Sequence, residues 1–320
     1  MTPPIAPIVT RFAPSPTGYL HLGHAYSALF TAEQAKQDNG GRFLLRIEDI
    51  DTPRIKPEFD AAIHEDLAWL GLNWETPVRR QSEHFDEYRA GLDKLDAQGL
   101  LYPCFCSRRE IRAEIEKSAA APHAPPSGPV LNPPTMSPEG PLYPGTCRRL
   151  SDDERKSREA EGKPFALRLD SAKATEMTGP LIWSDAEKGD VEATMDRLGD
   201  VVLARKDTPA SYHLAVTIDD HLQGVTLVTR GEDLFPSTHV HRLLQALLGL
   251  DTPPTAIFAC NDDMAAAAIT VAHQRKLNVP GDISICGFDD TPLASAIWPA
   301  LTTIRQPIRD MSREAIGLLG

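Results

Sequence analysis

The sequence has no apolar run of about 18 residues, the length that a helix needs to cross a lipid bilayer. Its first residues, Met-Thr-Pro-Pro, lack the basic and apolar segments of a secretory signal peptide. These two absences predict a cytoplasmic protein. Cysteine is also scarce. The five cysteines are an odd number for 320 residues, which argues against a disulfide framework and favours a metal site or buried thiols.

Basic residues are fewer than acidic ones: the sequence has 33 Lys and Arg residues and 45 Asp and Glu residues, which gives a net charge of −12. Such a balance excludes indiscriminate binding of nucleic acid by the whole surface, but it allows a local basic groove. The composition, 41% apolar and 24% charged, is that of a globular protein with room for two domains.

The most informative stretch, residues 11–24, reads RFAPSPTGYLHLGH. The pattern predicts a strand over 8–12, a turn stiffened by prolines, and a helix from His21. His21 and His24, one turn apart, can add hydrogen-bond donors to the free N–H groups with which a helix start binds phosphate. Gly23 between them lets a flat base approach the backbone. On the His-Leu-Gly-His tetrapeptide alone, a plain turn before an ordinary amphipathic helix remains an alternative.

Residues 8–75 predict a parallel strand-helix-strand-helix unit, with a buried second strand over 42–47 and a helix over 59–70. In such sheets ligands bind beyond the carboxyl ends of the strands, which is where Glu48 falls. Glu48 is either part of a site at this edge or a solvated charge at the end of a strand.

Three cysteines and a tyrosine have a spacing that suits a metal. Cys104 and Cys106 can hold one side of a zinc ion, and Tyr143 and Cys147 could complete a tetrahedron. From spacing alone, three buried free thiols explain the pattern equally well. The proline-rich segment between the two halves, about 118–142, has little apolar content and predicts a disordered surface loop.

The elements that follow are expected in two groups. Strands over 165–169 and 179–183 should belong to an insertion at about 100–195, and later strands should return to the main sheet. These later elements are strands over 200–205, 211–220 and 225–229, and a helix over 237–248 with Ser237 as its N-cap.

The stretch 11–24, continued by Arg46-Ile47-Glu48-Asp49, resembles the first signature of class I aminoacyl-tRNA synthetases in its glutamyl form. The cysteine and tyrosine pattern is similar to that of glutamyl-Q tRNA(Asp) synthetases, their short paralogues. The resemblance covers residues 1–254 and implies a Rossmann-type α/β catalytic domain with an inserted zinc-containing acceptor-end subdomain. It implies activation of L-glutamate with ATP and Mg²⁺, transfer to the queuosine of tRNA(Asp), and a structural Zn²⁺.

The same resemblance implies roles for particular residues. Glu48 takes the ammonium group of glutamate, and Arg11 takes a carboxylate, which an arginine fork suits geometrically. The glutamate site comprises Arg11, Phe12, Ala13, Pro14, Ser15, Glu48, Tyr212 and Arg230. The ATP site comprises His21, Gly23 and His24, with His21 and His24 as the catalytic residues. The zinc ligands are Cys104, Cys106, Tyr143 and Cys147.

From about residue 252 the sequence departs from this family. The second signature, a mobile loop of the Lys-Met-Ser-Lys-Ser type, is missing, and Arg275-Lys276 is followed by no Ser-Lys. Instead, residues 255–320 resemble the C-terminal part of the sugar-sensing, periplasmic-binding-like α/β domain of lac-repressor-type regulators. Asp262 matches a position that contacts the effector there. No DNA-binding module accompanies this fragment, so the sequence predicts a chimera.

Two functions follow as hypotheses. The first is an adenylating enzyme whose activity is impaired by the missing second signature. The second is a non-catalytic protein, whose C-terminal part binds a small ligand or merely completes the fold.

Overall fold

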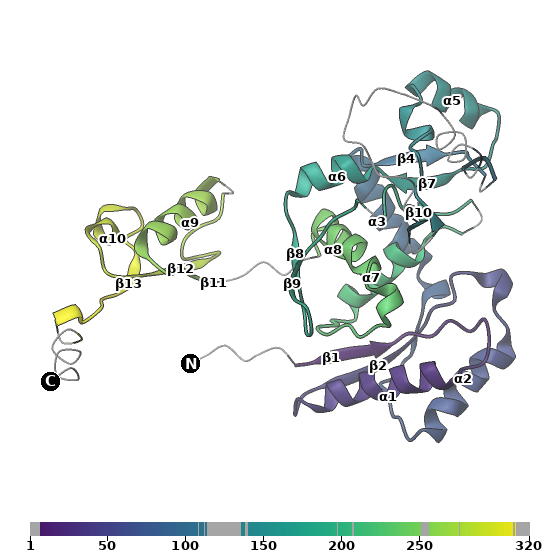
Figure 1. Cartoon of the computed structure of the whole chain (residues 1–320), viewed down its shortest axis with the longest axis horizontal. Helices are drawn as coiled ribbons and strands as arrows, with labels where there is room; N and C mark the ends of the chain where they lie inside the picture. The colour runs from purple at the N-terminus through teal and green to yellow at the C-terminus, as the bar shows by residue number, and fades with distance from the viewer. Residues whose placement is uncertain are drawn as a thin grey trace. The chain divides into compact units, whose positions relative to one another are not determined.

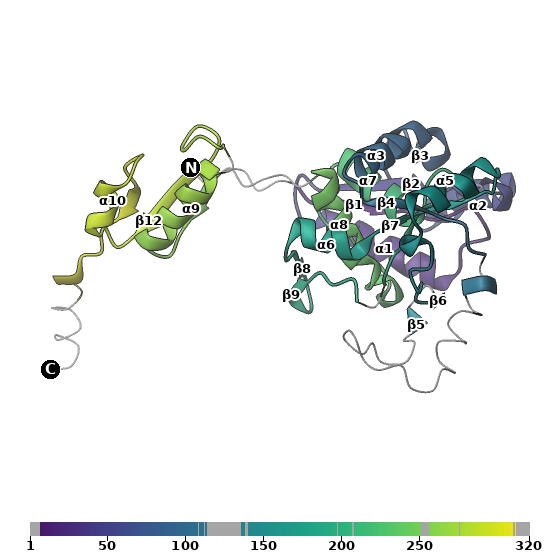
Figure 2. The same cartoon turned by 90° about the horizontal axis from the view of Figure 1, so that it is seen from above.

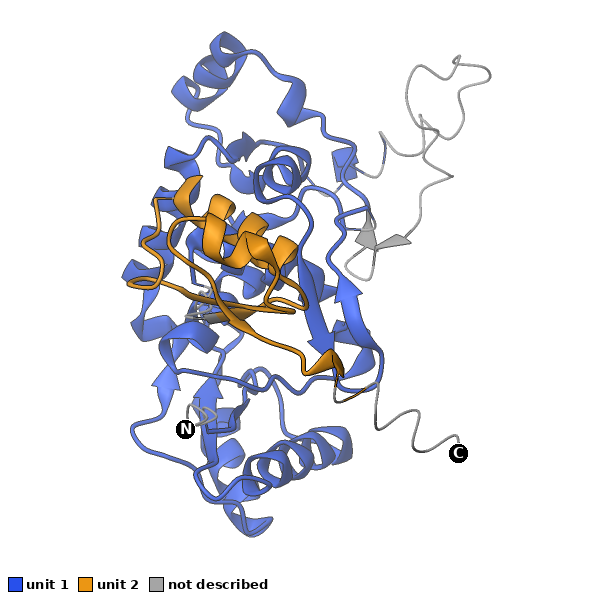
Figure 3. Cartoon of the chain, turned by 90° about the vertical axis from the view of Figure 1, so that its left-hand side faces the viewer, with its two compact units in different colours: residues 1–250 blue, residues 251–320 orange. Residues whose placement is uncertain are grey.

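The computed structural model forms two compact units, residues 1–250 and 251–320 (Figure 3). The residues that the structure describes are 7–107, 109–111, 113, 136–137, 140–196, 198–206, 208–250, 256–274, 276–309 and 311. A search of these residues finds no helix with the length and apolar character needed to span a membrane.

The first unit begins with a parallel sheet, which confirms the expected strand-helix-strand start. Its strands lie in the order β1 (Val9–Phe12), β2 (Arg42–Ile47) and β3 (Arg79–Arg80), connected by α1 (Leu22–Lys36) and α2 (Pro57–Trp69) (Figure 1). All four residues of β1 are buried, as are the last five of β2, because both faces of the sheet are covered. The carboxyl ends of β1 and β2 therefore lie at the same edge of this sheet, where the sequence predicts a ligand site.

Helix α1 has an unusual distribution of apolar residues. Its buried side carries alanines, Ala28, Ala32 and Ala35, whose small size allows close packing. Its other side leaves Leu22 86% exposed and Tyr26 69% exposed, in a stripe that Leu29 and Phe30 continue. An amphipathic helix normally buries such a stripe, so this face of α1 lacks a cover within the described residues.

A second, antiparallel sheet follows, in the order β10 (Val202–Ala204), β7 (Ala166–Leu169) and β4 (Leu101–Cys104). The expectation that residues 200–205 return to the main sheet is wrong. Asp200 accepts hydrogen bonds from Ser171 Oγ (2.8 Å) and the hydroxyl of Tyr102, which hold the start of β10 beside β7 and β4. Leu203 is completely buried in the core on this side.

Residues 211–220 form a helix, α7 (Tyr212–Leu222), and the strand expected there is wrong. Residues 213–220 are all buried, and a segment buried on every side shows neither helical nor strand periodicity. Ser211 sets the helical start, because its side chain accepts a hydrogen bond from Leu214 N.

The strand expected over 225–229 is also absent from the described residues. The backbone N–H groups of Thr226 and Leu227 both donate to Val9 O, which places the segment beside β1 without a regular ladder. Helix α8 (Ser237–Leu248) has the predicted bounds, although its N-cap is Pro236 and not Ser237. Helices α7 and α8 pack side by side (Figure 2) and share a core with α3 (Phe85–Ala97).

The strand expected over 179–183 starts later, at Ile182, because Gly179 ends α6 with a left-handed backbone conformation (φ 66°). Most of the loop expected at about 118–142 lies outside the described residues. The further elements of the first unit are α5 (Asp152–Ala160), α6 (Ser171–Thr178), the strand pairs β5 (Met136–Ser137) with β6 (Gly140–Pro141) and β8 (Ile182–Asp185) with β9 (Gly189–Glu192), and the 3₁₀ turns Thr52–Arg54, Gln81–Glu83, Cys147–Arg149 and Glu232–Leu234.

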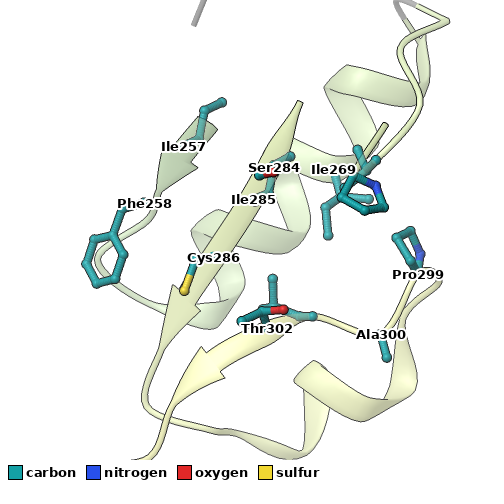
Figure 4. A pocket seen from close by; sticks show the side chains of 12 residues that line it. Ile257, Phe258, Ile269, Ser284, Ile285, Cys286, Pro299, Ala300 and Thr302 are labelled. Atoms are coloured by element: carbon teal, nitrogen blue, oxygen red, sulfur yellow. The ribbon is translucent and has the colours of Figure 1, made fainter. Parts of the chain in front are cut away.

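The second unit is a small parallel α/β layer. Its elements are β11 (Ala256–Phe258), α9 (Asp262–Gln274), β12 (Ser284–Phe288), α10 (Pro292–Ala296) and β13 (Thr302–Ile304), with strand order β11-β12-β13. A cavity of about 300 Å³ opens on it between Ile257, Ile285 and Pro299 (Figure 4). Phe258, which also lines this cavity, is 60% exposed, so the apolar side of the layer is only partly covered.

Candidate active site and metal centre

The first signature folds into a turn closed by its own histidines. His21 caps α1: its Nδ1 accepts from Gly23 N at 3.1 Å, and His21 N donates to His24 Nδ1 at 3.3 Å. The two rings stack with centroids 3.9 Å apart. Because both Nδ1 atoms accept hydrogen bonds, each neutral ring carries its proton on Nε2 and can offer it to a phosphate.

Gly23 provides the space for this arrangement. A side-chain carbon at this position would meet His21 Cε1 at 3.1 Å, closer than ordinary packing allows. Burial lowers the pKa of His24, and the neighbouring His21 lowers it further. His24 is therefore neutral near pH 7 and can act as a hydrogen-bond donor.

A buried ion network lies at the carboxyl edge of the main sheet. Arg11 Nε donates to Asp220 Oδ1 at 2.9 Å, and Arg46 Nη1 donates to the same oxygen at 2.7 Å. Arg11 also donates to Thr229 O at 3.2 Å. Burial raises the pKa of Asp220, but the charges of Arg11 and Arg46 outweigh this effect, so its pKa is lowered and the carboxylate is charged.

Asp219, the neighbour of Asp220, organises a second group. Arg79 Nε donates to Asp219 Oδ1 at 2.8 Å, Gln81 Nε2 donates to Oδ2 at 2.8 Å, and the hydroxyl of Tyr88 donates to the same carboxylate at 3.0 Å. The Asp219-Asp220 pair on α7 thus binds an arginine from each of β1, β2 and β3. Sequence reasoning missed this pair, although two adjacent aspartates inside an apolar run were a signal.

Glu48 lies at the end of β2 in contact with the signature turn. Its backbone N–H donates to Pro14 O at 3.0 Å, and its side chain, 14% exposed, accepts from Arg46 Nη2 at 3.2 Å. Burial raises the pKa of Glu48, against the lowering effect of Arg46 and Arg11. A buried carboxylate with a raised pKa gains from a further cation, so Glu48 can accept an ammonium group.

Tyr212 and Arg230 belong to the same electrostatic neighbourhood. Burial raises the pKa of Tyr212, and the charge of Glu48 raises it further. Burial lowers the pKa of Arg230, and the charge of Arg11 adds to this effect. The structure thus brings together Arg11, Glu48, Tyr212 and Arg230 from distant parts of the chain, and the backbone bond between Glu48 and Pro14 ties the signature turn to them.

The predicted metal ligands also meet. The sulfur atoms of Cys104, Cys106 and Cys147 lie within 4.8 Å of one another, and the Tyr143 hydroxyl is 3.8 Å from Cys106 Sγ. Four donors at such separations fit a tetrahedral ion with bonds of about 2.0–2.3 Å. A hydrogen bond from the Cys104 thiol lowers the pKa of Cys147, so Cys147 loses its proton more readily than an ordinary thiol.

Arg168 supports this cluster. Its guanidinium lies over the ring of Tyr143, 4.0 Å from the centroid, and Tyr143 Oη accepts a hydrogen bond from Cys147 N at 2.7 Å. These contacts fix the tyrosine oxygen beside the sulfur atoms. The donor set therefore suits a closed, structural zinc site.

Asp262 in the second unit has hydrogen-bond partners within that unit on both of its carboxylate oxygens. It is completely buried, and it accepts hydrogen bonds from Thr303 Oγ1 at 2.5 Å and Thr291 N at 2.6 Å. These hydrogen bonds join the start of α9 to β13 and to the segment after β12.

Comparisons with known proteins identify the family to which this chain belongs. A profile of the family described as "tRNA synthetases class I (E and Q), catalytic domain" matches residues 7–295. A glutamyl-Q tRNA(Asp) synthetase from Rhodobacter capsulatus is 48% identical over 257 residues, or 77% of this chain and 84% of that protein. A glutamate-tRNA ligase from Aquifex aeolicus is 40% identical over 251 residues, 78% of this chain and 48% of that ligase.

A solved glutamate-tRNA synthetase from Elizabethkingia anophelis superposes with a TM-score of 0.62 at 32% identity, covering 77% of this chain and 48% of that protein. The chain thus spans about half the length of these glutamate-tRNA ligases. A sugar-binding transcriptional regulator of the LacI family aligns with a TM-score of only 0.21 and supports no conclusion about residues 255–320.

The chain belongs to the class I aminoacyl-tRNA synthetases, in the family of glutamyl and glutaminyl catalytic domains. Within that family it is a ligase of the glutamyl-tRNA synthetase kind, with glutamyl-Q tRNA(Asp) synthetases among its relatives.

Proposed function

We propose that this chain activates L-glutamate with ATP and transfers the glutamyl group to the queuosine of tRNA(Asp), in the cytoplasm. The observation that carries the proposal is that a buried carboxylate, Glu48, and a guanidinium without a carboxylate partner in the described part of the chain, Arg230, interact electrostatically at the same site. Glu48 has a raised pKa, and Arg230 has no carboxylate partner among the described residues. An amino acid with an ammonium group and two carboxylates complements this arrangement.

The chemistry is attack of the glutamate carboxylate on the α-phosphorus of ATP. A new oxygen–phosphorus bond forms, the bond to the β-phosphate breaks, and pyrophosphate leaves with the electron pair. His21 and His24 would donate Nε2–H groups to the phosphates, and Mg²⁺ accompanying ATP would supply charge neutralisation. The protein contributes alignment and electrostatic stabilisation.

The specific acceptor is supported by the relatives. The proteins from Rhodobacter capsulatus, Symbiobacterium thermophilum and Nocardia farcinica are each named glutamyl-Q tRNA(Asp) synthetase, at 48%, 42% and 42% identity. The zinc site formed by Cys104, Cys106, Tyr143 and Cys147 would hold its ion in a purely structural role, because four protein donors leave no position for a reactive water.

The same proposal includes impaired adenylation and a C-terminal segment of foreign origin. The second signature is missing from the sequence, and residues 255–320 carry the pattern of a lac-repressor-type sensor domain. The alternative, a non-catalytic protein that binds a small ligand, rests on the second unit and its cavity.

ATP–pyrophosphate exchange tests the proposal, because only an adenylating enzyme returns labelled pyrophosphate to ATP. We expect slow exchange that requires glutamate, and glutamylation of tRNA(Asp) that contains queuosine but not of tRNA(Asp) that lacks it. Absence of both exchange and glutamate binding would favour the non-catalytic alternative.

A further inference from the structure

Two buried histidines that the proposed chemistry does not use lie near Arg230, one in contact with Arg230 and the other in contact with the first. His213 on α7 is 3% exposed, and His241 on α8 is 5% exposed. Both terminal nitrogens of Arg230 lie 3.3 Å from His241 Nδ1, and His241 Nε2 lies 3.2 Å from His213 Nδ1. The three side chains therefore form one hydrogen-bonded line.

Elementary chemistry fixes where each proton resides in this line. A guanidinium only donates hydrogen bonds, so Nδ1 of His241 must accept. The proton of a neutral His241 is then on Nε2, which donates to Nδ1 of His213. His213 in turn must carry its own proton on Nε2. Only one pair of tautomers satisfies all of these contacts.

The surroundings keep His241 neutral. Burial lowers its pKa well below the usual value, and the positive charges of Arg230, Arg11 and Arg46 lower it further, as does His213. The ring of Tyr212 also faces it, with centroids 5.5 Å apart. A protonated His241 would direct an N–H group at the Arg230 guanidinium, so the line exists only in the neutral form.

The line determines which edge of Arg230 is available. Nη1 donates to Thr238 Oγ1 at 3.0 Å and lies 3.5 Å from Leu234 O. The N–H groups of Nη1 and Nη2 that point toward each other both reach His241 Nδ1. The edge formed by Nε and Nη2 has no partner among the described residues. Two parallel N–H groups on that edge match the two oxygens of a carboxylate.

We propose that His241, held in one tautomer by His213, positions Arg230 so that its Nε–Nη2 edge binds a carboxylate of glutamate. His241 is thus a positioning residue that acts through Arg230. This inference rests on the proposed function, because it assumes that glutamate is the substrate. Glutamine offers one accepting oxygen where the glutamate carboxylate offers two, so the two parallel N–H groups of Arg230 fit glutamate better.

Two substitutions of His241 distinguish a role in positioning Arg230 from a role in packing alone. In His241→Asn the side-chain oxygen can occupy the place of Nδ1 and still accept from Arg230, whereas the longer side chain of His241→Gln places its polar group near Nε2. We expect His241→Gln to weaken glutamate binding to the full chain about tenfold or more, and His241→Asn to weaken it less than about threefold, by calorimetry. ATP affinity and thermal midpoint should be similar in both variants.

His239→Asn is the matched control on the same helix, because His239 contacts Thr194 N and Trp183 but not Arg230. It should leave glutamate affinity unchanged. Equal losses in His241→Asn and His241→Gln, or no loss in His241→Gln, would overturn the positioning role.

Nitrogen NMR of ¹⁵N-histidine-labelled protein gives a readout that is independent of substrate. We expect His241 to be neutral, with Nε2 protonated and Nδ1 unprotonated, from about pH 6 to 8. A protonated Nδ1 would overturn the inference whether or not glutamate binds. Failure of the unmodified chain to bind glutamate, with the expected spectrum, would instead overturn the proposed function and the substrate assignment that depends on it.

Discussion

Arg46 Nη1 and Asp220 Oδ1 lie 2.7 Å apart, in an ion pair whose side chains are only 0% and 9% exposed. The two residues are 174 positions apart in the chain, on β2 and α7. Arg46 also donates to Gln223 Oε1 at 3.0 Å, and Asp220 also accepts from Arg11. The shared carboxylate of Asp220 therefore holds α7, which begins with Tyr212, against β1 and β2, which end at Phe12 and Ile47.

Removing the charge of Asp220 should destabilise the first unit strongly. In Asp220→Asn, Arg11 and Arg46 remain buried without their shared counter-charge, which typically costs about 3–5 kcal/mol of unfolding free energy. Urea unfolding followed by circular dichroism would measure this loss. Asp86→Asn is the control, because the Asp86 pair with Arg89 is on the surface, with side chains 95% and 59% exposed. That variant should lose less than about 1 kcal/mol, and comparable losses in the two would contradict the prediction.

Acid should unfold the protein partly through Asp220. Burial alone would raise its pKa, but the neighbouring arginines lower the folded-state pKa below the unfolded value. The stabilisation is therefore complete above the unfolded pKa of about 3.9 and is lost as pH falls through the folded-state pKa. The acid limb of the stability profile should be steeper for the unmodified protein than for Asp220→Asn. Identical limbs would show that Asp220 is not part of the acid transition.

Glu48→Ala should weaken glutamate binding much more than ATP binding. The carboxylate is expected to pair with the substrate ammonium group, and loss of a hydrogen bond between charged groups typically costs about 1.5–3 kcal/mol, or about tenfold to a hundredfold in affinity. Calorimetric titration of each ligand would measure both affinities. Glu75→Ala is the control, because it removes a half-exposed carboxylate that pairs with Arg42. It should change neither the glutamate affinity nor the ATP affinity. Equal losses of glutamate and ATP affinity in Glu48→Ala would contradict the assignment of Glu48 to the ammonium group of glutamate.

Protein purified without chelators should contain about one zinc ion per chain, because four donors can close the site. Cys106→Ser should lose most of this zinc, whereas Cys260→Ser, at an exposed thiol in the second unit, should retain it. Metal analysis by mass spectrometry would measure the content. Less than about a tenth of a zinc per unmodified chain would refute the site.

Replacing the residues after Pro254 by the corresponding segment of an ordinary glutamyl-Q tRNA(Asp) synthetase should accelerate adenylation. The missing loop would bring Lys charge to the leaving pyrophosphate, and a single preorganised donor of this kind is typically worth about 10²–10³ in rate. Its absence should lower the rate more than the affinity for ATP. Pyrophosphate exchange in the two chains would measure the difference. Equal rates would show that the loop is dispensable or that Arg275-Lys276 replaces it.

The sequence by itself determined the start of the catalytic fold and indicated the residues of the candidate metal site. Two prolines, two glycines and two histidines within residues 11–24 indicate a local strand-turn-helix from the sequence alone. Cys104 with Cys106, and Tyr143 with Cys147, are close in sequence, so each half of the metal cluster is a local feature. Alternating or helical apolar patterns likewise predicted β2 and α8.

Only the tertiary structure decided that residues 212–222 form a helix and that β10 joins the second sheet. A segment buried on all sides has no polar face to set its period, and strand partners are chosen by packing and by contacts such as Asp200 with Ser171. The ion pairs of Asp220 and the line from Arg230 through His241 to His213 also depend on the tertiary fold. They join residues on separate elements, so their geometry exists only after the sheet and helices have packed.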